Sequence, residues 1–135
     1  MGLDQYILKR NKMLTNALVW KDQDDSETEV AYWRKNFSIN QWFAEHVDGF
    51  DNNAYSLITK SCIEELRHSC KQIIEASQNS DKDAEEIATK LGFDEFYIDD
   101  IEDFIYSVTN QLKKITEILN TINWEMEELY YYPSW

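Results

Sequence analysis

The chain has 135 residues and a formal net charge of −13, from 26 acidic and 13 basic residues. This length suits one domain over residues 1–135, and a hydrophobic content of 43% with 19 aromatic residues excludes a disordered acidic tail. The negative charge disfavours nucleic acid as a direct ligand, because its phosphates would be repelled.

Neither a membrane segment nor a secretion signal is visible in the sequence. All apolar runs are shorter than the roughly 18 residues that cross a membrane, and the first ten residues lack the apolar core of a signal peptide. The protein is therefore expected in the cytoplasm, with no membrane partner. Cys62 and Cys70 fall on one predicted helix, about 12 Å apart along its axis. They cannot bridge each other and are interpreted as small buried apolar residues.

The N-terminal third is predicted to form a hairpin and then an amphipathic helix. Residues 3–8 and 17–20 are short apolar runs that read as strands, and a polar acidic loop over residues 21–28 follows. Over residues 29–47, the apolar side chains fall on one half of a helical wheel. They are Val30, Tyr32, Trp33, Phe37, Ile39, Phe43, Ala44 and Val47.

Three polar or aromatic residues depart from this helical pattern. Asn36 and Asn40, one turn apart, point into the apolar half, and Trp42 falls among the polar residues. A buried amide costs about 1–3 kcal/mol if it is left unpaired. We therefore expect both asparagines to be buried and hydrogen-bonded, with at least one partner from the N- or C-terminal segment.

Three further helices and a last strand are predicted. Ser61 begins a helix with a capping box, although Thr59 would serve as well, and Asp81 caps a short helix that Gly92 ends. The longest helix has an apolar residue at alternating spacings of three and four. These seam residues are Ile98, Ile101, Ile105, Val108, Leu112, Ile115, Leu119 and Ile122. Residues 127–132 are expected to form a last strand that joins the N-terminal hairpin.

The predicted fold class is α+β and mostly helical. About four helices, including the long C-terminal heptad helix, are expected to pack on a small antiparallel sheet. The other helices of the chain are expected to cover the heptad seam. A coiled-coil homodimer through this seam is the alternative.

No catalytic motif is found. The chain has no Gly-rich phosphate loop, no HExxH, no CxxC and no GxSxG. His46 and His68 lack the spacing of paired metal ligands and are interpreted as ordinary surface histidines. We therefore expect no catalytic residue, no metal and no cofactor, and a function other than catalysis.

A cationic pair marks the first candidate site. Guanidinium and ammonium groups suit phosphate, an aromatic ring suits stacking on a base, and amides suit base edges. The candidate ligand-binding residues are therefore Tyr32, Trp33, Arg34, Lys35, Asn36 and Asn40. The alternative is a basic edge that pairs with the neighbouring acidic loop.

Acidic residues mark the second candidate site. Residues 79–135 hold 14 acidic and four basic residues, a net charge of −10. The candidate partner-binding residues lie at and before the start of the long helix: Asp94, Glu95, Asp99, Asp100, Glu102 and Asp103. Carboxylates there also suit the helix dipole, which is the alternative. An acidic face would attract a basic partner, such as the groove of a DNA-binding protein.

Four collinear stretches resemble a family of small uncharacterised proteins encoded by bacteriophages and prophages. They are GLDQY at the start, YWRK with the following WF, FDEFY after residue 92, and the terminal YYYPSW. The family pattern opens GLDMYL, continues YWRKANAIHxWF, has a YDEYYY-like stretch and closes YYQSSW. This chain has Asn40 where the family has histidine, and Phe37 where it has asparagine. An amide cannot act as an acid or base near neutral pH, as an imidazole can.

The resemblance implies a phage-encoded accessory protein in the host cytoplasm. Our first hypothesis is that it binds and inhibits a host antiviral nuclease or its complex, with DNA mimicry as one mode. The partner is then a host protein that binds nucleic acid. The second hypothesis is that the cationic candidate site sequesters a small ligand such as a nucleotide signal. The third is an unusual enzyme in the same pocket.

Overall fold

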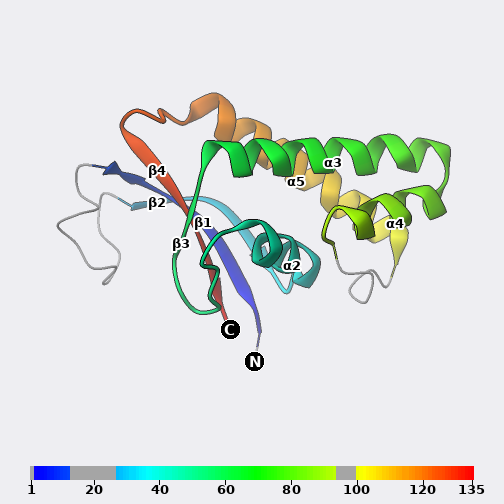
Figure 1. Cartoon of the computed structure of the whole chain (residues 1–135), viewed down its shortest axis with the longest axis horizontal. Helices are drawn as coiled ribbons and strands as arrows, with labels where there is room; N and C mark the ends of the chain where they lie inside the picture. The colour runs from blue at the N-terminus through cyan, green and yellow to red at the C-terminus, as the bar shows by residue number, and fades with distance from the viewer. Residues whose placement is uncertain (1, 13–26, 94–99) are drawn as a thin grey trace.

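Strands from both ends of the chain lie in one sheet, and the helices come between them in sequence (Figure 1). The structure, a computed structural model, describes residues 2–12, 27–93 and 100–135. In chain order its elements are β1 (Asp4–Asn11), β2 (Glu27–Arg34), α2 (Phe37–His46), β3 (Ser56–Ile58), α3 (Lys60–Asn79), α4 (Asp81–Lys90), α5 (Ile101–Thr121) and β4 (Glu127–Ser134). The predicted α+β class, with its long C-terminal helix, is confirmed.

The sheet is antiparallel with the strand order β2-β1-β4-β3. Strand β1 is central, since Tyr6 lies opposite both Tyr32 of β2 and Tyr132 of β4. The predicted pairing of the last strand with the N-terminal segment is therefore confirmed. Residues 17–20, the predicted hairpin partner of β1, lie outside the described residues.

Residues 29–47 do not form one helix, and this prediction was wrong in its first half. Residues 27–34 form strand β2, and α2 begins at Phe37. The run EVAYW is rich in β-branched and aromatic residues, which favour a strand, and pairing with β1 satisfies its backbone. Trp42 was predicted among the polar residues but is completely buried. Ser38, one turn earlier on the same side, is buried as well.

Helices α3 and α4 both begin at a side-chain cap. Thr59 Oγ1 accepts a hydrogen bond from the Cys62 N–H at 3.1 Å, so Thr59 caps α3. Ser80 Oγ accepts from the Asp83 N–H at 3.0 Å, so Ser80 caps α4. The predicted cap of α4, Asp81, is instead its first residue, where its charge suits the helix dipole.

The two cysteines lie buried in α3 and are not bonded to each other, as predicted. Burial raises the pKa of Cys62 to about 11 and that of Cys70 to about 12. Both thiols therefore stay protonated near neutral pH and pack as small apolar side chains.

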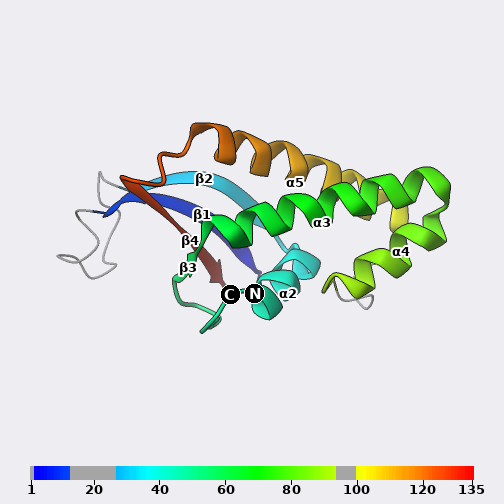
Figure 2. The same ribbon diagram turned by 45° about the horizontal axis from the view of Figure 1, so that its top comes forward.

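Helix α5 packs against α3, and α4 lies at the far end of this pair (Figures 1 and 2). Val108 and Ile115 of the predicted heptad seam are completely buried, so the chain covers its own seam at these positions. The other described seam residues are half-buried. The stripe of buried side chains on α5 is displaced to one side of the predicted seam. The remaining buried residues of α5 are Phe104, Gln111 and Ile118. Ile98 lies outside the described residues.

One apolar cluster joins the sheet to the helices. Ile7, Ala31, Leu129 and Tyr131 contribute from one face of the sheet, and the buried residues of the helices complete the cluster. Burial of this apolar surface provides the main driving force for folding. Among the helices that the structure describes, none is both long and apolar enough to cross a membrane.

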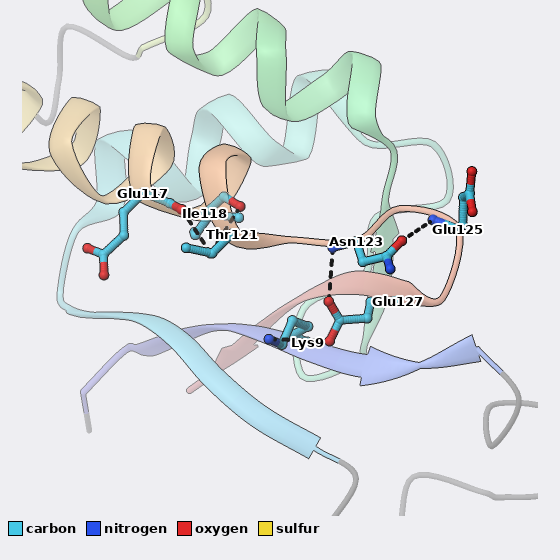
Figure 3. A network of polar contacts seen from close by, with 7 residues as sticks. All are labelled: Lys9, Glu117, Ile118, Thr121, Asn123, Glu125 and Glu127. Carbon is cyan, nitrogen blue, oxygen red and sulfur yellow. Dashed lines mark hydrogen bonds and ion pairs between the residues drawn. The ribbon is translucent and has the colours of Figure 1, made fainter.

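Local hydrogen bonds hold the connection between α5 and β4 (Figure 3). Asn123 Oδ1 accepts from the Glu125 N–H at 3.1 Å, and Glu127 Oε1 accepts from the Asn123 N–H at 3.0 Å. The other carboxylate oxygen of Glu127 lies 3.3 Å from the ammonium group of Lys9 in β1. The turn before β4 is thereby attached to the central strand, which helps to align the two terminal strands.

Replacing Val108 with aspartate should unfold the protein. The side chain is completely buried in the apolar cluster, and a buried unpaired carboxylate costs several kcal/mol. Circular dichroism and light scattering measure helix content and mass. The control Lys113→Asp changes an exposed residue of the same helix and should unfold cooperatively, like the unaltered protein. A folded Val108→Asp monomer released from a dimer would show instead that the seam is an interface between two copies.

Candidate functional site

The turn between β2 and α2 carries the predicted cationic pair. Lys35 has a φ of 55°, a left-handed conformation that costs a residue with a Cβ about 1–2 kcal/mol. Its N–H donates to the Leu3 carbonyl at 2.6 Å. In the next residue, the Asn36 N–H donates to Gln5 Oε1 at 2.9 Å, and Gln5 Nε2 donates to the Asn36 carbonyl at 3.0 Å. Three hydrogen bonds, one to Leu3 just before β1 and two to Gln5 in β1, therefore hold this turn in its strained form.

Asn36 links the turn to two helices through its side chain. Its Oδ1 accepts from the Ile39 N–H at 3.2 Å, which caps α2, and from the Ser38 hydroxyl at 3.0 Å. Its Nδ2 donates to Ser107 Oγ of α5 at 3.3 Å. Ser107 Oγ also accepts from Gln111 Nε2 at 3.2 Å. The half-buried Asn36 thus sets the start of α2 and its distance from α5.

Asn40 belongs to a buried polar network. The Tyr131 hydroxyl donates to Asn40 Oδ1 at 2.7 Å and accepts from Gln5 Nε2 at 2.9 Å. The predicted hydrogen bonding of both asparagine side chains is therefore confirmed, and Tyr131 is the partner from the C-terminal segment. The predicted burial is correct for Asn40, whereas Asn36 is only half-buried because it caps α2 at the edge of the fold. Burial raises the pKa of Tyr131, while the hydrogen bond from Gln5 opposes this rise, so the phenol stays protonated and donates.

A surface pocket of about 430 Å³ opens beside this turn. Its lining combines the turn, the start of α2 and the start of α5: Arg34, Lys35, Asn36, Phe37, Ser38, Asp100, Asp103, Phe104 and Ser107. Three of the predicted ligand-binding residues and two of the predicted acidic residues thus meet at one place. The sequence assigned them to two separate sites.

The pocket lining combines hydrogen-bond donors with carboxylates. The N-terminal ends of α2 and α5 both reach it, and each carries a partial positive charge. Asp100 Oδ1 accepts from the N–H groups of Glu102 at 2.9 Å and Asp103 at 3.3 Å, so Asp100 already caps α5. The exposed Arg34 and Lys35 bring two full positive charges to the same lining.

The other predicted residues lie away from the pocket. Tyr32 is on the opposite face of the sheet, where its hydroxyl donates to Asp4 Oδ1 at 2.7 Å. Trp33 is half-buried against the apolar cluster. Asn40 is 9% exposed and bonded to Tyr131, as described above.

The predicted acidic face is only partly described. Glu102 is exposed in the first turn of α5, whereas Asp94, Glu95 and Asp99 lie outside the described residues.

Sequence reasoning missed four pocket residues, one of which is Ser38 in the first turn of α2. The other three are Phe37, Phe104 and Ser107, and none of the four belonged to a predicted site. Phe37 directly follows the Asn36 cap, and this adjacency was the only signal for it. Phe104 and Ser107 lie far along the chain from Arg34, so nothing local connects them.

The two histidines and the acidic groups offer no metal centre in the described part of the chain, where no group of three or more potential metal ligands was found. His46 is half-buried rather than a plain surface residue. Its ring stacks on Trp42 at 4.0 Å, and its Nδ1 lies 2.8 Å from the Trp42 carbonyl. His68 is exposed on α3, as expected.

No protein family, no curated protein and no solved structure matched the chain. The geometry therefore carries the functional argument. The pocket offers cationic donors, helix N-termini, the carboxylate of Asp103, which has no hydrogen-bond partner among the described residues, and two aromatic rings. This lining suits binding of a small ligand with an anionic group.

Replacing Tyr131 with phenylalanine should lower the free energy of unfolding by about 1–3 kcal/mol, because two buried amides each lose a partner. Urea denaturation measures this change. The control is Tyr132→Phe, which should be nearly neutral, because the Tyr132 hydroxyl has no hydrogen bond among the described residues. Equal losses in both variants would contradict the network.

The stability of the unaltered protein and that of the Tyr131→Phe variant should respond differently to alkaline pH. The Tyr131 pKa is raised above its ordinary value of 10.0 in the folded state, so this phenol stabilises the fold fully below pH 10 and loses that effect as pH rises further. The Tyr131→Phe variant lacks this loss. The difference in the free energy of unfolding between the unaltered protein and the variant, measured by urea denaturation, should therefore become smaller above pH 10.

Proposed function

We propose that this protein acts by binding, and that the pocket beside Arg34 holds a small phosphate-bearing ligand such as a nucleotide. The observation that supports this best is the meeting of two cationic side chains with two helix N-termini at one pocket. Backbone N–H groups at helix starts and guanidinium groups are preferred donors to phosphate oxygens. The pocket volume of about 430 Å³ lies within the usual range for ligand pockets.

The rest of the lining suits the base of a nucleotide. Asp103 can accept hydrogen bonds from the N–H groups of an amino-bearing base, whereas Asp100 is already engaged as the helix cap. Phe37 and Phe104 supply apolar ring surface beside it. The carboxylate would repel a second phosphate group, so a ligand with separate anionic and hydrogen-donating ends fits better than an inorganic polyanion.

Removing the guanidinium should weaken nucleotide binding. We expect Arg34→Ala to raise the Kd for the four ribonucleoside monophosphates about 10- to 100-fold, since a charge-assisted hydrogen bond contributes about 1.5–3 kcal/mol. Isothermal titration calorimetry measures the Kd. Lys71→Ala, which removes an exposed cation from α3, is the matched control and should bind normally. No binding by the unaltered protein, or equal loss in the control, would contradict the proposal.

Two variants of Lys35 separate binding from stability. Lys35→Gly and Lys35→Ala both remove the ammonium group, so both should bind the nucleotide less tightly. Only glycine adopts the left-handed φ of 55° freely. Lys35→Gly should therefore be more stable than Lys35→Ala, by about 1 kcal/mol. If affinity followed stability across this pair, the loss of binding would come from the turn and not from the charge.

A second candidate function is docking of a basic host protein, such as an antiviral nuclease, on the acidic surface. Glu102 and Asp103 are exposed in the first turn of α5, and Asp81, Glu85 and Glu86 are exposed or partly exposed on neighbouring α4. The resemblance to phage proteins supports a setting in the cytoplasm of an infected host. Such an acidic array would compete with DNA for a positively charged groove.

Reversing two charges tests the acidic surface. Glu102→Lys with Asp103→Lys should abolish capture of a nucleic-acid-binding protein from host lysate, and capture should weaken steeply at salt above physiological strength. Asp100 stays unaltered because it caps α5. The control reverses Glu64 and Glu75, both exposed on α3. Capture that survives the α5 reversal but is lost with Arg34→Ala would favour the pocket instead.

A further inference from the structure

Four tyrosines form a continuous row across the sheet. Tyr32 of β2, Tyr6 of β1 and Tyr132 of β4 are cross-strand neighbours, and Tyr55 directly precedes β3. Their ring centroids are 5.3 Å apart between Tyr32 and Tyr6, 6.2 Å between Tyr6 and Tyr132, and 4.4 Å between Tyr132 and Tyr55. We call these four residues the tyrosine row. It crosses every strand spacing of the sheet, about 15 Å in all.

The tyrosine row lies on the face of the sheet away from the apolar cluster. Side chains alternate between faces along a strand, so Ile7 and Tyr131 point into the cluster while Tyr6 and Tyr132 point the other way. Tyr32 is 39% exposed, and Leu57 beside the row in β3 is 50% exposed. Tyr6, Tyr55 and Tyr132 are half-buried. Tyr32, at the β2 end, is therefore the most exposed member of the row.

Carboxylates accompany the row at its β2 end. Asp4 accepts a hydrogen bond from the Tyr32 hydroxyl, and Glu29 is exposed on the same strand as Tyr32. Burial, then the charges of Asp4 and Glu29, raises the pKa of Tyr6, which places both carboxylates near its ring. The hydrogen bond to Asp4 raises the pKa of Tyr32, and the nearby positive charge of Arg34 opposes this rise. Two negative charges and one positive charge thus surround this end.

We propose that the tyrosine row is a docking surface for an extended, arginine-bearing segment of a partner protein. The aliphatic stems of such residues cover aromatic rings while their charged ends reach carboxylates, here Asp4 and Glu29. Tyrosine is enriched at protein interfaces because it buries a large area at low entropic cost. An extended segment of four or five residues matches the length of the row.

The negative charge beside the tyrosine row disfavours two other binding partners. A second copy of this chain would bring Asp4 and Glu29 against their own equivalents, and both copies carry a net charge of −13. A single nucleic acid strand could stack on aromatic rings, but its phosphates would meet the same carboxylates. A basic peptide is attracted by both features. Arg34 lies at the edge of both this surface and the ligand pocket, but the four tyrosines, Asp4 and Glu29 are not part of the pocket lining, so either proposal can fail alone.

The test uses a fluorescent 12-residue peptide of alternating arginine and serine, in 0.15 M salt so that unspecific attraction is screened. Fluorescence anisotropy gives its Kd for the full chain. We expect Tyr32→Ser to raise this Kd at least tenfold. Tyr106→Ser, which removes a 70% exposed tyrosine from α5, is the matched control and should leave it unchanged. Circular dichroism checks that both variants are folded.

A second pair of variants tests the charges. Asp4→Asn with Glu29→Gln keeps acceptors for hydrogen bonds but removes both charges, and should also raise the Kd at least tenfold. Glu64→Gln with Glu75→Gln, on exposed positions of α3, should not. Three results would overturn the proposal: no peptide binding by the unaltered protein, equal losses in the controls, or tighter binding of a ten-nucleotide single strand than of the peptide.

Discussion

The fold depends on one buried amide, that of Gln5. This side chain is completely buried in the central strand, where an unpaired amide would cost about 1–3 kcal/mol. Its oxygen accepts from the Asn36 backbone, and its nitrogen donates to the Asn36 carbonyl and to Tyr131. The side chain thus acts as an extra rung of the sheet just beyond the end of β2. It joins the N-terminal strand, the C-terminal strand and the start of α2 at one point.

The candidate pocket follows from this constraint. Because Asn36 is held at both its backbone groups, the residue before it must turn sharply, and Lys35 adopts a left-handed conformation. Strand β2 therefore ends at Arg34, and Arg34 and Lys35 are left exposed at the rim of the pocket. The Asn36 side chain then caps α2 and contacts Ser107 of α5. Backbone strain of about 1–2 kcal/mol at Lys35 is stored where the cationic groups lie, as is common at binding sites.

The helices with strong local signals were predictable from the sequence. Thr59, one of the two predicted caps, caps α3, and α5 shows a long apolar period. Strand β2 was not predictable in this way, since its aromatic run fits both a helical face and a strand. The pairing that decides between them is with β1, whose paired residues lie 17 to 30 positions earlier in the sequence. Local periodicity carries no information about such a partner.

The same distinction explains what was found of the candidate site. Arg34, Lys35 and Asn36 are consecutive, so their chemistry was visible in the sequence. Phe104 and Ser107 come to them only through the packing of α5, which no local pattern encodes. Trp42 was misplaced because its burial depends on how α2 packs in the whole fold.

Strand alternation gives neighbouring tyrosines opposite roles. In β4, Tyr131 is completely buried and bonds to Gln5 and Asn40, while Tyr132 joins the tyrosine row on the other face. A shift of β4 by one residue would exchange the two faces. Because the chemistry of the two side chains is identical, apolar burial alone would distinguish the registers weakly. The Gln5–Tyr131–Asn40 hydrogen bonds form only in the observed register, so the same network that stabilises the core also determines which tyrosines reach the surface.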